Sequence, residues 1–235
     1  MEYPGDYINK IICGDCLEVM SGMPDGCVDL CVADPPFNVG KDYGKFDDKK
    51  KEKEYWNWIT KRIEEIFRVL KENSRFYVFH TDFGVFKLRP ICEKAGFKFH
   101  QMLIWYGPNT VGAGSRISKD WNCMHENILL FHKGKRTPML QASHVTNSFS
   151  VQCHVRPQSN FSGGRDHPAQ KPVSLLACLI SRSPGEIVLD PFCGVGSSLI
   201  AAKNLGRNFT GIEINPDYRK IAEERLSQRV FNFKD

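Results

Sequence analysis

Asp34, Pro35, Pro36 and Phe37 are the residues of this sequence best suited to chemistry. They follow a short apolar run, 27–33, whose β-branched residues predict a buried strand with a polar end. Two prolines fix the backbone and carry no N–H group, so a rigid, extended turn should follow. The carboxylate, the Pro35 carbonyl and the aromatic ring would then meet at the carboxyl edge of a sheet, where open α/β folds bind ligands. Two acceptors beside an aromatic face suit a planar group with an exocyclic NH2, although a purely structural turn would use the same residues.

A second stretch with chemical potential starts at Asp190, where another predicted strand ends. The glycines at Gly194 and Gly196 precede a predicted helix and have no Cβ, so a ligand could approach their backbone closely. The next predicted strand ends in Glu213, and an acid about twenty residues beyond a glycine turn is the usual position of a ribose-binding carboxylate. The turn does not read G-x-G-x-x-G, which disfavours a nicotinamide cofactor.

The elements that must position these residues alternate between strands and helices, which predicts an α/β fold. Strands are expected at 8–13, 27–33, 75–80, 97–106, 128–131, 186–190 and 208–212, and helices at 54–72, 84–95, 172–183, 199–205 and 215–229. Asp15 then follows the first strand, so a further carboxylate should lie at the same sheet edge.

The positive charge of the chain is concentrated in its middle. The whole chain has a formal net charge of +5, and the segment from Gly107 to Lys171 alone accounts for it, which predicts a surface that faces a polyanion. If that polyanion is a nucleic acid, Lys133, Lys135 and Arg136 are predicted to contact its phosphates, and 141–164 to read its base sequence. A solvated loop with incidental charge is the competing interpretation.

Composition excludes several classes of protein. The 235 residues contain no apolar run of about 18 residues and no signal-peptide pattern at the amino end, so neither a membrane span nor secretion is expected and a cytoplasmic location is predicted. The nine cysteines should be reduced there. Cys13 and Cys16 have C-x-x-C spacing, but no second pair with suitable spacing follows, so no metal site is predicted.

Taken together, these motifs resemble those of an S-adenosylmethionine-dependent amino DNA methyltransferase. Residues 34–37 match the family's D-P-P-[YF] motif, residues 190–196 match its F-x-G-x-G cofactor loop, and residues 167–172 are similar to the segment before its first cofactor helix. The catalytic motif precedes the cofactor loop here, which is the permuted order of the β group. The resemblance implies a Rossmann-like methyltransferase fold in three parts: a catalytic part (1–106), a target-recognition insertion (107–167) and a cofactor part (168–235).

The resemblance also implies roles for individual residues. Phe192, Gly194 and Gly196 would surround the cofactor. Glu213 would bind its ribose, Asp15 would accept a hydrogen bond from its adenine amine, and Lys171 would lie near its methionine end. Asp34 and the Pro35 carbonyl would bind the target amine, and Phe37 would stack on a flipped base. Double-stranded DNA is the implied partner. A homodimer and a separately acting restriction endonuclease are compatible with the family.

The resemblance leaves alternatives open. Cytosine-C5 methylation is disfavoured because no cysteine follows a proline, and without that nucleophile Glu126 is attributed to structure alone. Asp rather than Ser at position 34 favours adenine-N6 over cytosine-N4. A catalytically silent nucleic-acid-binding subunit should have lost Asp34 or the glycine turn, and both are present. RNA or protein-glutamine methylation would use related chemistry.

Overall fold

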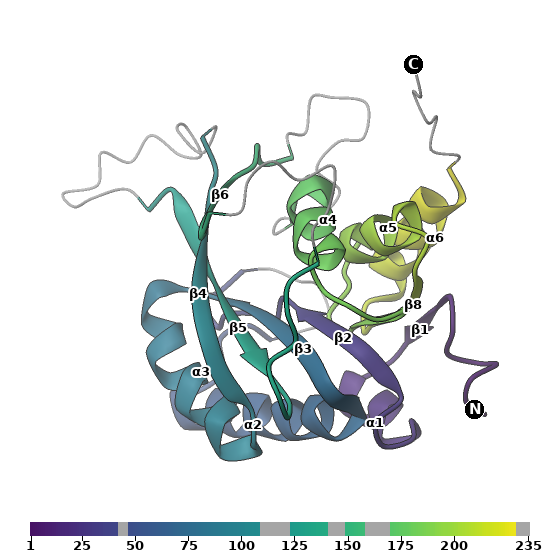
Figure 1. Cartoon of the computed structure of the whole chain (residues 1–235), viewed down its shortest axis with the longest axis horizontal. Coiled ribbons are helices and arrows are strands. Elements are labelled where there is room, and N and C mark those ends of the chain that lie inside the picture. Colours follow the sequence, from purple (N-terminus) through teal and green to yellow (C-terminus); the bar gives the residue numbers. More distant parts are fainter. Residues whose placement is uncertain (42–46, 109–122, 141–148, 158–169, 229–235) are drawn as a thin grey trace.

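The computed structural model of this chain describes residues 1–41, 47–108, 123–140, 149–157 and 170–228, and its central feature is an eight-stranded sheet (Figure 1). The strands are β1 (Lys10–Cys13), β2 (Val28–Ala33), β3 (Leu70–His80), β4 (Lys98–Tyr106), β5 (His125–His132), β6 (Val151–Cys153), β7 (Ile187–Asp190) and β8 (Asn208–Glu213). Their order across the sheet is β1-β8-β7-β2-β3-β5-β4-β6. β5 is antiparallel to both of its neighbours and the other pairs are parallel, which confirms the predicted mostly parallel sheet.

Helices cover both faces of the sheet (Figure 1): α1 (Cys16–Ser21), α2 (Glu52–Val69), α3 (Asp82–Ala95), α4 (Val173–Ser181), α5 (Ser197–Asn204) and α6 (Pro216–Ser227). α1, α2 and α3 pack on one face, where Met20 and Ile63 belong to one buried apolar cluster. α4, α5 and α6 pack on the other, with Leu179 and Leu199 in a second cluster. These three layers confirm the Rossmann-like fold. Among the described helices, none is both long and apolar enough to span a membrane.

The order of the strands places four acidic residues at one edge of the sheet. β2 lies between β7 and β3, and five of its six residues are buried, so its direction and register are set by the core. β1, β8, β7 and β2 are adjacent and parallel, and their carboxyl ends therefore lie side by side. Asp15, Asp34, Asp190 and Glu213 stand at or just beyond these four ends.

The middle of the chain contributes more to the sheet than the sequence predicted. β5 has eight residues and lies inside the sheet, whereas only a brief strand at 128–131 was expected. β6 was not predicted at all, and it extends the sheet by pairing in parallel with β4. The predicted insertion at 107–167 therefore contains an integral strand of the catalytic sheet. For the remainder of the chain the three-part division stays a prediction.

Candidate active site

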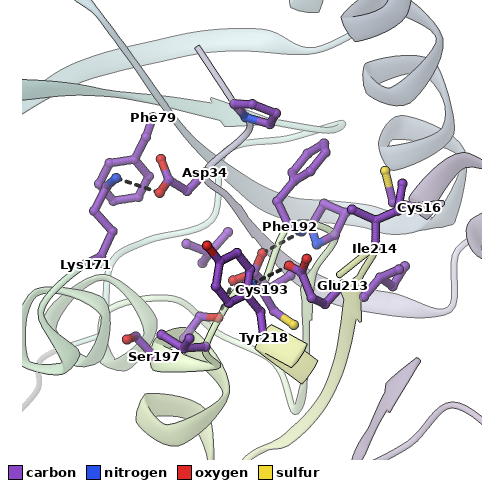
Figure 2. A pocket seen from close by; sticks show the side chains of 18 of the residues that line it. Cys16, Asp34, Phe79, Lys171, Phe192, Cys193, Ser197, Glu213, Ile214 and Tyr218 are labelled. Atoms are coloured by element: carbon purple, nitrogen blue, oxygen red, sulfur yellow. Dashed lines mark hydrogen bonds and ion pairs between the residues drawn. The ribbon is translucent and has the colours of Figure 1, made fainter. Parts of the chain in front are cut away.

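Asp34 stands immediately after β2, and its carboxylate lies 2.6 Å from the ammonium group of Lys171 (Figure 2). Lys171 comes from the segment before α4, 137 positions further along the chain. Burial raises the pKa of Asp34, and the adjacent ammonium group opposes that rise. Burial alone would lower the pKa of Lys171, but the carboxylates of Asp34 and Glu126 raise it. One oxygen of Asp34 is thus occupied by a charged, buried donor.

The other carboxylate oxygen of Asp34, Oδ1, is buried and has no hydrogen-bond partner among the described residues. Asp34 lines a pocket that brings together most of the predicted site residues, namely Asp15, Asp34, Pro36, Lys171, Asp190, Phe192, Gly194 and Glu213. Pro35, Phe37 and Gly196 are not among the residues that line it. A buried acceptor without a donor is costly, so Oδ1 suits an incoming N–H group.

An aromatic hydrogen-bond chain holds the turn after Asp34. The Tyr55 hydroxyl donates to the Pro36 carbonyl and lies 2.9 Å from Nε2 of His80. The backbone N–H of Thr81 donates to Nδ1 of the same imidazole, so Nε2 carries the proton. Burial lowers the pKa of His80 to about 4, which keeps the ring neutral at pH 7. Phe37 stacks on this neutral ring with the centroids 5.0 Å apart, so one of its faces is supported.

Asp190 organises the turn that follows β7. Its Oδ1 accepts the backbone N–H of Phe192 at 2.9 Å, and its Oδ2 accepts the hydroxyl of Ser198 in α5. Burial raises the pKa of Asp190 to about 7, although both hydrogen bonds favour the charged form. Both oxygens therefore shape the loop that precedes α5.

Gly194 and Gly196 differ in what requires a glycine. Both have left-handed backbones, with φ values of 51° and 78°. A Cβ on Gly196 would lie 3.0 Å from the Cβ of Ala222 in α6, so α6 packs against the space that this glycine leaves. Only Gly194 lines the pocket. The space beside Gly194 thus opens to the pocket, whereas α6 occupies the space beside Gly196; a cofactor contact at either glycine stays a prediction.

Glu213 lies across the pocket from Asp34 and Lys171 (Figure 2). Its Oε2 accepts the N–H of Gly194 at 2.9 Å, and its Oε1 accepts the N–H of Asn215 at 2.8 Å. Burial raises the pKa of Glu213, and these backbone groups favour its charged form. A carboxylate can accept about four hydrogen bonds, so Glu213 keeps capacity for two hydroxyl donors.

Asp15 forms the third corner of the pocket. It caps α1 by accepting the N–H of Leu17 at 2.8 Å, and its other oxygen pairs with Arg62 of α2. The guanidinium group of Arg62 lies 3.9 Å from the ring centre of Trp58 and is nearly buried. Sequence reasoning missed Arg62, because an arginine within an amphipathic helix pattern is typical of the exposed face.

The three residues predicted to bind phosphates lie at the opposite edge of the sheet. Because β5 is antiparallel to β3, it carries the chain away from the edge that holds Asp34. At about 3.3 Å per residue, its eight residues separate Lys133, Lys135 and Arg136 from that edge by roughly 25 Å. Most of the predicted sequence reader, 141–164, lies outside the described residues.

The Lys133 side chain makes hydrogen bonds within the fold. Its ammonium group donates to the carbonyls of Phe67 and Leu70, both at 2.7 Å, and so satisfies acceptors at the end of α2. The backbone N–H of Lys135 donates to the side chain of Asn73 at 2.9 Å, which fixes the turn after β5. These contacts account for the Lys133 side chain and the Lys135 backbone, and a contact of the three residues with DNA phosphates stays a prediction.

Glu126 is the most consequential residue that the sequence analysis left aside. Its carboxylate lies 3.1 Å from the ammonium of Lys171 and 2.7 Å from the guanidinium of Arg156. The one signal available was a charged residue just before the apolar run 128–131.

Asp82, Cys123 and His125 form an exposed cluster at the start of α3. Their donor atoms lie within 4.8 Å of one another, an arrangement that the scattered spacing in the sequence did not predict. Cys123 and His125 both hydrogen-bond to the Asp82 carboxylate, so the cluster is explained by contacts among its own members.

Comparisons with known proteins agree with this geometry. A family described as "DNA methylase" matches residues 28–224. The chain is 30% identical to the type II methyltransferase M.HpaI of Haemophilus parainfluenzae, over 95% of this chain and 76% of that protein. It is 29% identical to the DNA adenine methyltransferase YhdJ of Escherichia coli, over 94% and 84%.

Two solved structures share the fold. One is a complex of M1.HpyAVI with SAM, with a TM-score of 0.72 and 23% identity over 93% of this chain and 99% of that one. The other is the cytosine-N4-specific PvuII DNA methyltransferase, with a TM-score of 0.78 and 19% identity over 94% and 87%.

Proposed function

This chain belongs to the DNA methylase family of S-adenosylmethionine-dependent N6 and N4 amino-methyltransferases, and we propose that it methylates the N6 amine of adenine in duplex DNA. One observation carries the proposal: Asp34 presents a buried oxygen without a partner among the described residues, at the wall of the pocket. An exocyclic amine supplies the N–H donor that this oxygen lacks.

The pocket residues fit the cofactor that the family uses. Glu213 has spare acceptor capacity for the two ribose hydroxyls, and Gly194 leaves room beside it. Phe192 lies 5.9 Å from the ring of Trp58, which gives the adenosine an aromatic wall. Asp15 would accept from the adenine amine and Lys171 would face the methionine end. When bound, S-adenosylmethionine supplies an electrophilic methyl group on a sulfonium sulfur.

The residues around Asp34 would then activate the amine. A hydrogen bond from one N–H to Oδ1 of Asp34, and one from the other to the Pro35 carbonyl, favour a pyramidal nitrogen whose lone pair points out of the ring plane. Positioning of this kind supplies most of the rate in a transfer that needs no covalent enzyme intermediate. The target must leave the duplex to reach the pocket, and the base would stack on Phe37, which packs on His80 and is 8% exposed without the base.

Adenine is favoured over cytosine by two observations. Position 34 is Asp, and the relative YhdJ is named as an adenine enzyme. A cognate endonuclease and a homodimer remain predictions.

The test is tritium transfer from labelled S-adenosylmethionine to duplex DNA, RNA and protein in parallel, followed by nucleoside analysis. We expect label in DNA as N6-methyladenine, and none with Asp34→Ala. Label in N4-methylcytosine would show that adenine is not the target base, and label confined to RNA or protein would show that DNA is not the substrate.

A further inference from the structure

Four charged side chains form a partly to fully buried row that leads away from the pocket. Asp34 pairs with Lys171 at 2.6 Å, Lys171 with Glu126 at 3.1 Å, and Glu126 with Arg156 at 2.7 Å. They come from the turn after β2, the segment before α4, β5 and the segment after β6. Because the charges alternate in sign, Lys171 lies between two carboxylates.

Glu126 has the firmest support in this row. It lies within β5 and pairs with Trp105 of β4 in the sheet. Arg156 binds its Oε1, and the same guanidinium lies 4.2 Å from the ring centre of Trp105. Burial opposes the charge of Glu126, but Lys171 and Arg156 together lower its pKa, so the carboxylate is charged at neutral pH.

The Lys171 ammonium lies between two carboxylates, and the rings of Phe37, Phe79 and Trp105 lie 5.5, 5.2 and 6.0 Å from it. A lysine ammonium is a point charge on a flexible stem, so one contact with Asp34 does not define its direction. Lys41 also faces the group, and the charges of Lys41 and Lys171 repel each other. Glu126 offsets that repulsion and draws Lys171 to one side of Asp34, which leaves the opposite oxygen of Asp34 open.

We propose that Glu126 is a positioning residue for methyl transfer: it holds the ammonium of Lys171 against Oδ2 of Asp34, so that Oδ1 alone faces the target amine. This inference rests on the proposed function of Asp34. Glu126 itself contacts neither the base nor the cofactor in this scheme.

The test is Glu126→Gln, which keeps the size of the side chain and removes its charge. Weakening one charge-assisted contact should lower kcat by about ten- to a hundredfold, while the Kd for S-adenosylmethionine changes by less than about threefold. Losing one of two carboxylates should also lower the pKa of Lys171, so the rate should begin to fall at a lower alkaline pH. A titration of lysine side chains labelled with 13C at Cε reports that pKa directly by NMR. Glu126→Asp should restore part of the rate.

Glu65→Gln is the matched control, because Glu65 pairs with Arg68 within α2 and lies outside the pocket. An unchanged kcat and alkaline limb in Glu126→Gln would overturn the inference, as would a loss of cofactor affinity equal to the loss of rate. If the wild type methylates cytosine, the proposed base is wrong and the same rate comparison still decides the role of Glu126. If DNA is not methylated, the NMR titration decides it, and an unchanged Lys171 pKa would overturn it.

Discussion

If Asp34 accepts a hydrogen bond from the target amine, Asp34→Asn should lose more activity than the loss of a charge alone would cause. An asparagine has one acceptor oxygen and one donor NH2 group. The ammonium of Lys171, 2.6 Å from Oδ2 in the wild type, can only donate, so it should take the amide oxygen. The NH2 group would then point at the pocket, where the target amine also brings a donor.

The expected loss is therefore larger than that of one hydrogen bond. A hydrogen bond to a charged group contributes about 1.5 to 3 kcal/mol, and two opposed donors add a desolvation cost of similar size. At about 1.4 kcal/mol per factor of ten, the single-turnover rate should fall roughly a hundredfold or more. Cofactor affinity, measured by calorimetry, should stay within about threefold because Asp34 is assigned to the amine.

Two comparisons sharpen this test. Asp25→Asn, at an exposed partner of Arg68, should leave the rate unchanged. Adding Lys171→Met to Asp34→Asn frees the amide oxygen to turn toward the amine, so the double variant should be faster than Asp34→Asn alone when both are compared at saturating S-adenosylmethionine, which offsets the loss of Lys171 from the methionine end. If Asp34→Asn retained more than about a tenth of the wild-type rate, or the double variant recovered nothing, Lys171 would not set the orientation of Asp34.

Gly194→Val should abolish cofactor binding, measured by calorimetry, because Gly194 lines the pocket. Gly206→Val is the control: Gly206 is also left-handed, no atom lies within 4 Å of a Cβ there, and the change should only lower the Tm. Normal cofactor binding by Gly194→Val would show that this turn is merely structural. Asp190→Asn should become more stable relative to the wild type as pH rises from 3.8 to about 7, because ionising Asp190 lowers the unfolding free energy of the wild type over that range. Denaturant unfolding at pH 5 and 8 measures the difference between the two proteins, and a constant difference would contradict the prediction. Lys133→Met should lower the unfolding free energy by about 1 to 3 kcal/mol and leave the salt dependence of DNA binding unchanged. A weaker dependence of the DNA-binding constant on salt concentration would show that Lys133 contacts DNA phosphates.

Local patterns carried the sequence analysis a long way. The strand before Asp34, the turn from Asp190 to Gly196 and the acid at Glu213 are each specified by neighbours in the chain, and the structure brings Asp34, Asp190 and Glu213 to one sheet edge. Proline and glycine restrict the backbone wherever they occur, so their consequences are readable without the fold.

Contacts between distant segments were beyond those patterns. The direction of β5 decides that Lys133 faces away from the site and that Glu126 reaches it, and nothing within 125–132 encodes that direction. The pairing of Arg62 with Asp15 depends likewise on how α2 packs beside α1. In each case a charged residue that would suit an exposed surface acquires its role from a partner far away in the sequence.

The sheet order also governs when this protein can acquire its pocket during synthesis. β1 and β2 are close in sequence, but β8 and β7, which follow the other six strands of the sheet in the chain, lie between them. Three strand spacings of about 4.8 Å therefore hold β1 and β2 roughly 14 Å apart in the finished sheet. A nascent chain in which β7 and β8 are not yet available has two unpaired inner edges at this gap, the kind of surface that favours misassembly and slow folding. The segments that form β7 and β8 must leave the ribosome before the walls around Asp34 can close.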